Sequence, residues 1–270
     1  MPTPSHWNAP SAKWLEFVKP RPRAGIRLLC FPYAGGSALA FRDWQDALPD
    51  FIEVWPIQLP ARGRRISEPP FTRTGDVVDA VEKALFGYLD KPYAIFGYSM
   101  GALIAFELAR RAESCPVLSP SHLFVGARGA PHLRSRMGPT HKLPDPQFLL
   151  ELRRFQATPD EILDDPELIQ FFLPTLRADF EVAMAYEFLE GPPLRCPISA
   201  FGGLEDPDVP TEDLEPWQLH TAAHCSLQLF PGGHFFLNAC RADLLSAISR
   251  DLIKLVSSEP NRRGLGQAVR

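Results

Sequence analysis

Six short apolar runs, separated by segments with helical spacing of apolar residues, are the feature that most restricts the possible folds of this chain. Short buried strands that alternate with helices form a parallel sheet covered by helices on both faces. We therefore expect an α/β fold with a mostly parallel central sheet. Its strands are predicted at Ile26–Phe31, Ile52–Ile57, Tyr93–Phe96, Leu123–Val125, Ile198–Phe201 and Leu227–Phe230, and its helices include Val77–Leu89, Leu103–Ala112 and Ala242–Val256.

One block interrupts this alternation. From about residue 132 to 191 the pattern is helical, with stretches at Pro146–Phe155, Pro159–Leu163 and Pro166–Leu189. Ligands bind beyond the carboxyl ends of parallel strands, so a helical insertion between two strands is expected to cover that edge as a lid. We expect residues 1–270 to form a single domain with this lid, an N-terminal arm over 1–24 and a flexible tail over 257–270.

The composition excludes several kinds of partner. The formal net charge is −4, whereas a nucleic-acid-binding face is basic. No apolar run approaches the roughly 18 residues of a membrane-spanning helix, and the first ten residues are not those of a signal peptide. The five cysteines contain no CxxC pair, which favours free thiols in a reducing compartment. We expect a soluble cytoplasmic monomer without metal, cofactor, membrane or nucleic-acid partner.

A candidate nucleophile follows the third predicted strand. Gly97-Tyr98-Ser99-Met100-Gly101 is a G-x-S-x-G motif, preceded by the apolar run Tyr93–Phe96 and followed by a helical stretch. Strand, sharp turn and helix form the nucleophile elbow, where flanking glycines make room for a tight backbone. The amino end of the helix favours developing negative charge. The context therefore predicts Ser99 as a nucleophile rather than a residue of an ordinary turn.

The remaining members of a triad are expected after Ser99, the acid first and the histidine last. His234 follows the last strand in a Gly-Gly-His loop, whereas His220 and His224 precede that strand and are expected to be solvated. The strand near Ile198 ends in Gly202-Gly203-Leu204-Glu205-Asp206-Pro207-Asp208. We choose Asp206 over Glu205 and Asp208, with the role of accepting the imidazole Nδ1–H.

A tetrahedral intermediate also needs hydrogen-bond donors directed at its oxyanion. The backbone N–H of Met100, directly after the nucleophile, is one candidate. The other is expected in the loop after the first strand, Phe31-Pro32-Tyr33-Ala34-Gly35-Gly36-Ser37, where the N–H of Ala34 has the right position in sequence. The glycines of this loop also fit a simple turn.

With these residues in view, the chain resembles the type II thioesterases of polyketide and non-ribosomal peptide biosynthesis, members of the α/β-hydrolase superfamily. The resemblance extends from about residue 26 to 253. It is carried by six motifs in order: FPYAGGSA (31–38), QLPARGRR (58–65), GYSMGA (97–102), LRADF (176–180), FGGLEDP (201–207) and GGHFFL (232–237). One departure is Ala61, where the family often has glycine in LPGRxxR.

The resemblance implies a Ser99–Asp206–His234 triad, with Met100 and Ala34 as oxyanion donors. It also implies an acyl pocket beneath the lid and a substrate in which an acyl group is attached to the phosphopantetheine arm of an acyl or peptidyl carrier protein. We expect Tyr33, Tyr98, Phe155 and Phe180 to contact the acyl group. Other lid side chains either line the pocket or form plain core: Leu149, Phe171, Phe172, Leu176 and Met184.

Several alternatives stay open at this point. Arg62, Arg64 and Arg65 either meet an acidic carrier protein or the pantetheine phosphate, or they are solvated or paired with local carboxylates. The function itself has three competitors: a carboxyl-ester hydrolase, a chain-releasing thioesterase, and a non-catalytic α/β-hydrolase serving as a binding module. A free-standing chain favours an editing role over chain release, and a candidate for every triad position argues against the binding module.

Overall fold

A single parallel sheet organises the chain, as predicted. The computed structural model describes residues 13–114, 118–155, 158 and 160–257. Within them six strands lie in the order β2-β1-β3-β4-β5-β6, and every pairing is parallel. The strands are β1 (Ile26–Phe31), β2 (Ile52–Pro56), β3 (Tyr93–Tyr98), β4 (His122–Gly126), β5 (Ile198–Gly203) and β6 (Cys225–Phe230). The expected α/β fold is confirmed, with strands that extend a few residues past several predicted ends.

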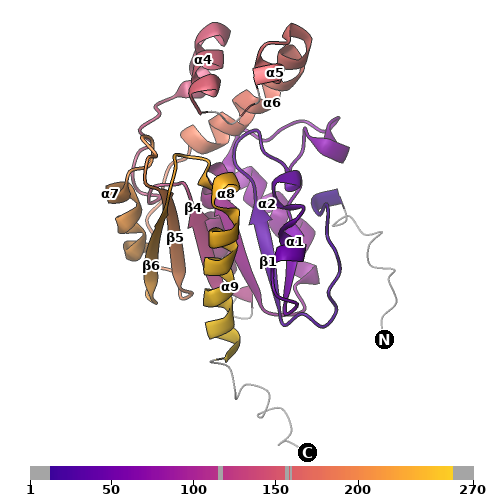
Figure 1. Ribbon diagram of the computed structural model, residues 1–270, viewed down its shortest axis with the longest axis vertical. Helices are drawn as coiled ribbons and strands as arrows, with labels where there is room; N and C mark the ends of the chain where they lie inside the picture. The colour runs from indigo at the N-terminus through magenta and orange to yellow at the C-terminus, as the bar shows by residue number, and fades with distance from the viewer. Residues whose placement is uncertain (1–12, 115–117, 156–157, 159, 258–270) are drawn as a thin grey trace, which may run out of the picture.

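Helices cover both faces of the sheet (Figure 1). On one face α2 (Thr74–Leu85) and α3 (Met100–Ala112) pack against the strands, and on the other lie α1 (Trp44–Ala47) and α9 (Arg241–Ser257). Because both faces are covered, β1 to β5 are buried at every position. Short elements complete the fold: η3 (Ala38–Phe41), η4 (Gly63–Arg65), η5 (Phe86–Tyr88), η7 (Thr140–Lys142), α7 (Thr211–Leu214), η8 (Glu215–His220) and α8 (Phe236–Ala239).

Three helices between β4 and β5 stand over the carboxyl ends of the strands (Figure 1). They are α4 (Asp145–Phe155), α5 (Asp160–Leu163) and α6 (Pro166–Met184). Asp165 caps α6 by accepting the N–H groups of Glu167 and Leu168 at 2.9 and 3.1 Å, and Pro166 suits the first helical turn. The three helices share an apolar core of Phe148, Leu152, Phe155, Leu163, Leu176 and Phe180. We refer to these three helices as the lid. The last of them, α6, was predicted to end at Leu189 but ends at Met184.

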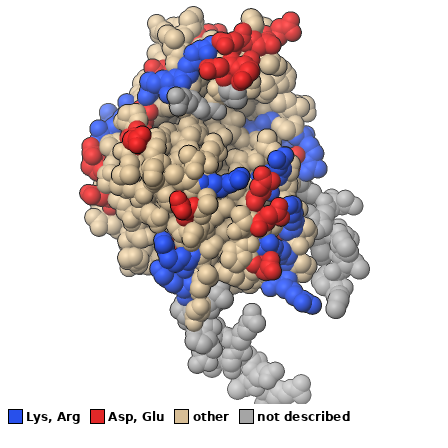
Figure 2. Space-filling view, in the orientation of Figure 1, with Lys and Arg blue, Asp and Glu red and all other residues tan. Residues whose placement is uncertain are grey.

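The predicted arm is packed against the sheet from Lys13 onward. Trp14 is buried beneath the guanidinium of Arg65, 4.0 Å from its ring centroid, and Leu15 forms a bridge with Ile57. The predicted tail lies outside the described residues, apart from Ser257. None of the helices in the described ranges has the length and apolar character to cross a membrane. On the face shown in Figure 2, basic and acidic side chains are interspersed, and on the lid a basic group lies beside an acidic one.

Ala61 occupies a backbone conformation that suits glycine. Its φ is +61°, its N–H donates to the carbonyl of Arg65 at 3.0 Å, and it is buried. A Cβ in the left-handed region costs roughly 1–2 kcal/mol, partly offset because glycine has more freedom in the unfolded chain. The loop around Ala61 therefore keeps the backbone conformation expected for glycine, and Ala61 adopts it with a strained backbone.

We expect Ala61→Gly to raise the free energy of unfolding by about 0.5–1 kcal/mol. Urea unfolding followed by tryptophan fluorescence measures the change. Gly25→Ala, where an added Cβ meets nothing within 4 Å and φ is not positive, is the matched control for a glycine–alanine exchange. A lower stability of Ala61→Gly would contradict the assignment of strain to this residue.

Candidate active site

Ser99 lies on a strained turn between β3 and α3. Its backbone has φ 53° and ψ −111°, a region that non-glycine residues rarely adopt. The two motif glycines make that turn possible: a Cβ on Gly97 would lie 2.2 Å from the carbonyl oxygen of Gly101, and one on Gly101 would lie 2.3 Å from that of Phe31. The serine is thus projected from the carboxyl edge of the sheet, as in a nucleophile elbow.

Ser99, His234 and Asp206 form one hydrogen-bonded chain. The Nε2 atom of His234 lies 3.0 Å from Ser99 Oγ, and its Nδ1 lies 2.7 Å from Asp206 Oδ2. Ser99, His234 and Asp206 lie in the loops that follow β3, β6 and β5, respectively. Because these strands are parallel, their loops meet at one edge of the sheet, although Ser99 and His234 are 135 residues apart in sequence. With Nδ1 donating to the carboxylate, Nε2 is free to accept the serine proton.

The environment of Asp206 keeps it ionised. Burial is the largest single influence and acts to raise the pKa of this carboxyl group, but the hydrogen bond and charge of His234 and two backbone hydrogen bonds together outweigh it, and the net pKa is lowered. The N–H groups of Asp208 and Val209 also donate to Oδ1, at 3.0 and 3.2 Å. Glu205 is exposed, and Asp208 pairs with Arg154 of α4 at 2.9 Å. Of the three acids considered from sequence, Asp206 is the one that contacts His234.

Tyr98 positions the histidine loop rather than lining a pocket. Its side chain is fully buried, its hydroxyl donates to the carbonyl of His234 at 2.5 Å, and it accepts the N–H of Leu237 at 3.3 Å. Burial also raises its pKa well above the usual value, so it remains a neutral donor. Sequence reasoning placed Tyr98 against the substrate; its position beside the nucleophile gave no sign of its contact with the distant histidine loop.

The two candidate oxyanion donors lie on adjoining segments. Gly101, at the start of α3, packs against the backbone of Phe31 and Pro32, where the loop carrying Ala34 begins. Met100 is the first residue of α3, so its N–H has no acceptor within the helix. Within the described part of the chain, neither the N–H of Met100 nor that of Ala34 has a hydrogen-bond acceptor. Both groups are therefore available to an oxyanion.

Two narrow hollows meet at Ser99 and His234, and they differ in polarity. The first is mostly apolar, and besides the pair it is lined by Tyr33, Ala34, Met137, Phe155, Phe180, Ala183, Met184 and Phe235. The structure thus places Tyr33, Phe155 and Phe180 beside the serine. Their contact with an acyl group stays a prediction. Phe171 is 60% exposed and Leu176 lies in the lid core.

The second hollow carries charge. Its lining includes Arg128, Arg134, Arg136, Asp208 and Asp213. Arg128 is buried and donates to the carbonyl of Ala183 near the end of α6 at 3.2 Å, and burial lowers its pKa to about 10. It therefore remains a cation at neutral pH. Arg136 pairs with Asp213 at 2.6 Å.

The arginines of the 58–65 motif are paired within the chain. Arg62 and Arg65 are buried, the first against Asp179 and the second against Glu68. Arg64 is the exposed member and contacts Glu16 at 3.1 Å. All three guanidinium groups pair with carboxylates of this chain, and of these pairs only Arg65–Glu68 is local in sequence. Contact of the exposed Arg64 with a carrier protein stays a prediction.

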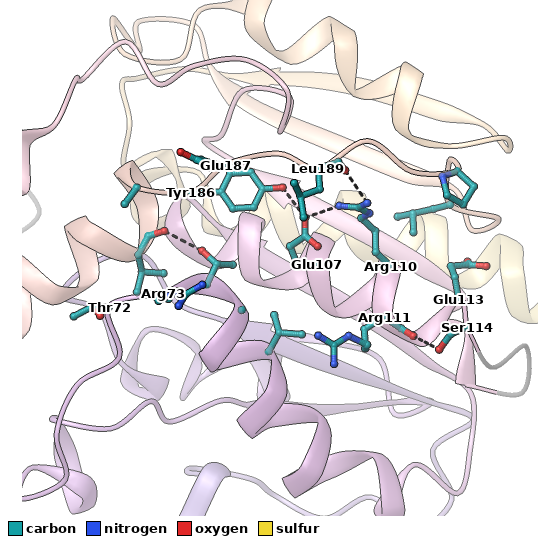
Figure 3. Close-up of a pocket in the computed structure, with 17 residues that line it drawn as sticks. Thr72, Arg73, Glu107, Arg110, Arg111, Glu113, Ser114, Tyr186, Glu187 and Leu189 are labelled. Atoms are coloured by element: carbon teal, nitrogen blue, oxygen red, sulfur yellow. Dashed lines mark hydrogen bonds and ion pairs between the residues drawn. The ribbon is translucent and has the colours of Figure 1, made fainter.

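A larger groove of about 620 Å³ lies away from the triad, between α2, α3 and the segment after α6. Figure 3 shows Glu107 at its centre, accepting from Tyr186 and Arg110 at 2.6 and 2.9 Å, while Arg110 also donates to the carbonyl of Leu189. These charges satisfy one another, and no triad residue lines the groove. We therefore place the chemistry in the two hollows at Ser99, although the groove is larger.

A second cluster of serine, histidine and aspartate lies at the opposite edge of the sheet. Ser199 contacts His122 Nε2 and Asp251 Oδ2, each at 2.9 Å, and is 1% exposed. Here the serine lies between the other two. Its single proton goes to the carboxylate, so His122 must donate to it, whereas a general base would accept. The cluster is a buried polar network rather than a catalytic triad.

Two histidines are buried in the neutral form. Burial lowers the pKa of His122 to about 4 and that of His220 to about 4. His220, expected to be solvated, instead packs among Phe106, Phe188 and Trp217. The sequence signal for this was weak, because two of the three aromatic partners, Phe106 and Phe188, come from distant segments.

We expect these histidines to make the fold acid-sensitive. Between pH 6.5 and about 4 the unfolded chain binds protons at both residues and the native chain does not. The free energy of unfolding should therefore fall as pH decreases, by about 1.4 kcal/mol per pH unit for each histidine. Urea unfolding of wild type and His122→Gln at pH 7, 6 and 5 tests this. The variant should show the shallower dependence on pH, and equal slopes would contradict the claim.

A chain order of serine, aspartate and histidine around a parallel sheet is the arrangement of the α/β-hydrolases, and the protein is of that class. The family model described as a thioesterase domain matches residues 26–252. The chain belongs to this thioesterase family.

Similar proteins narrow the class further. The chain is 40% identical over 240 residues to the gramicidin S biosynthesis protein GrsT of Aneurinibacillus migulanus, covering 89% of this chain and 94% of that protein. It is 35% identical to the thioesterase PikA5 of Streptomyces venezuelae, covering 91% and 88%. The solved structure of the type II thioesterase BorB from the borrelidin cluster has 36% identity and a TM-score of 0.81, covering 88% and 97%. The chain is a thioester hydrolase of the type II class, as the motifs indicated.

Proposed function

We propose that the protein hydrolyses acyl thioesters on the phosphopantetheine arm of carrier proteins, in an editing role, with Ser99 as nucleophile. The observation that carries the proposal is the hydrogen-bonded chain of Ser99, His234 and Asp206 at the junction of an apolar and a charged hollow. The names of the relatives support a role in such a biosynthetic pathway, since BorB is a type II thioesterase from the borrelidin biosynthetic cluster and GrsT is a gramicidin S biosynthesis protein.

The first half of the proposed reaction acylates the serine. His234 Nε2 takes the proton of Ser99, and Oγ attacks the thioester carbonyl. The N–H groups of Met100 and Ala34 stabilise the resulting oxyanion. When the tetrahedral intermediate collapses, the C–S bond breaks and the pantetheine thiolate takes the proton from His234.

The second half releases the acyl group. Water, deprotonated by His234, attacks the acyl-serine carbonyl, and the C–O bond to Ser99 breaks with return of the proton to Oγ. Asp206 stays ionised throughout and stabilises the imidazolium. The product is a free carboxylic acid.

The two hollows suggest how the substrate lies. The apolar hollow, with Phe155, Phe180 and Met184, suits the acyl chain. The charged hollow, with Arg128 and Arg134, suits the polar pantetheine arm and its phosphate.

A substrate panel tests the proposal. Acyl-pantetheine and acyl-carrier-protein thioesters are assayed beside matched oxygen esters, with Ser99→Ala as the control for background hydrolysis. We expect higher kcat/KM for the thioesters and a free acid as product. Faster turnover of the oxygen esters would identify a carboxyl-ester hydrolase, a cyclised product would identify a chain-releasing enzyme, and no turnover would favour a binding module.

A further inference from the structure

Two sequence motifs without a catalytic role meet in a buried ion pair. Arg62, from the 58–65 motif, and Asp179, from the 176–180 motif on lid helix α6, are 117 residues apart. Their contact is bidentate: Nη1 to Oδ2 and Nη2 to Oδ1 are both 2.7 Å, and the side chains are 9% and 4% exposed. Such a fork-to-fork pair fixes direction as well as distance.

The same pair holds the loop that carries Ala34. Asp179 Oδ2 accepts the N–H of Gly35 at 2.7 Å, and Arg62 Nη1 donates to the carbonyl of Gly36 at 2.8 Å. Gly35 has φ +77°, and a Cβ there would lie 2.6 Å from Leu176 of α6. The residues directly after Ala34 are therefore fixed to the lid helix by charge-assisted hydrogen bonds and by close packing.

Stability alone is a weak explanation for this arrangement. Desolvation of two charges offsets most of their attraction, and apolar replacement of a buried pair is often neutral or stabilising. The pair instead fixes the relative positions of three segments: the 58–65 motif, loop 33–36 and helix α6. Asp179 is followed by Phe180, which lines the apolar hollow, so one helix sets both the hollow wall and the loop beside it.

We propose that Arg62 and Asp179 are positioning residues that couple the lid to the oxyanion hole, holding the Ala34 N–H in place only while α6 is seated on loop 33–36. This inference rests on the proposed role of Ala34 at Ser99. It predicts that the pair affects transition-state stabilisation more than substrate binding, because neither side chain lines either hollow at the serine.

The experiment compares three altered proteins with wild type. Arg62→Met/Asp179→Leu removes both charges together and avoids a lone buried ion. Arg62→Lys keeps the charge but loses the two parallel bonds. Glu53→Gln is the matched control, because it breaks the buried Arg27–Glu53 pair, whose side chains are 11% and 5% exposed and which joins β1 to β2 outside the site.

The readouts separate positioning from folding. We expect kcat of the double variant to fall by about 10², the effect of losing one oxyanion donor, with KM within a factor of about two. Affinity for a boronic acid, which forms a tetrahedral adduct on serine, should fall in parallel, and Arg62→Lys should show a smaller loss of both. Glu53→Gln should lower the urea midpoint and leave kcat unchanged.

Wild-type kcat and boronate affinity in a double variant that folds would overturn the proposal, as would wild-type values in Arg62→Lys. The rate of labelling by a fluorophosphonate depends on the same oxyanion hole and on no particular acyl substrate. It therefore tests the coupling even if the thioester panel were to favour oxygen esters. An unlabelled wild-type protein would instead refute the proposed nucleophile.

Discussion

Replacement of Ser99 by alanine is expected to lower kcat for thioester hydrolysis by about 10⁴–10⁶-fold, the loss seen when the nucleophile of a serine triad is removed. The reason is that no acyl-enzyme can form, while the hydrogen-bond donors at the oxyanion site remain. Single-turnover hydrolysis of an acyl-pantetheine measures the effect.

The folded state of Ser99→Ala should be preserved, because alanine keeps the Cβ and its strained backbone at φ 53°. Ser99→Gly is the matched variant: it also lacks the hydroxyl but relieves strain, so it should unfold at higher urea than Ser99→Ala, by about 1 kcal/mol in free energy. Turnover by either variant at a rate near wild type would refute the role of this serine.

Asp206→Asn is expected to reduce kcat by about 10⁴-fold with little change in structure. An asparagine amide at the position of Oδ2 would donate to Nδ1 of His234, and the imidazole would then carry its proton on Nε2, where it cannot accept from Ser99. The acceptor for the N–H groups of Asp208 and Val209 is retained in the side-chain carbonyl.

Glu205→Gln is the control for Asp206→Asn, since it neutralises the adjacent, exposed carboxylate. Its kcat should equal that of wild type, and release of the pantetheine thiol from an acyl-pantetheine measures the activity of both variants. If Asp206→Asn were as active as wild type, or if Glu205→Gln lost most of its activity, the assignment of Asp206 as the acid of the triad would be wrong.

The sequence predicted those features that depend on local pattern and chain order. The strands follow from short apolar runs, and the elbow follows from two glycines around Ser99. His234 and Asp206 were placed by their positions after late strands, because parallel strands present their carboxyl ends at one edge. These features can be predicted without knowing which side chains from distant segments contact each other.

The features that were missed arise from contacts between segments far apart in the chain. Three contacts were missed: Tyr98 with the histidine loop, His220 with Phe106 and Phe188, and Arg62 with Asp179. Each joins elements whose relative placement no periodicity encodes. The short helices α1, α7 and α8 have four residues each, too few for a helical period to be seen.

The central claim is that Ser99, activated by His234, is the residue that becomes acylated. Its most direct test is fluorophosphonate labelling of the intact protein, followed by peptide mass spectrometry of wild type and His234→Ala. We predict a single adduct on the tryptic peptide 84–110, whose one serine is Ser99, and loss of that adduct in His234→Ala. Labelling at Ser199, or equal labelling without His234, would contradict the account.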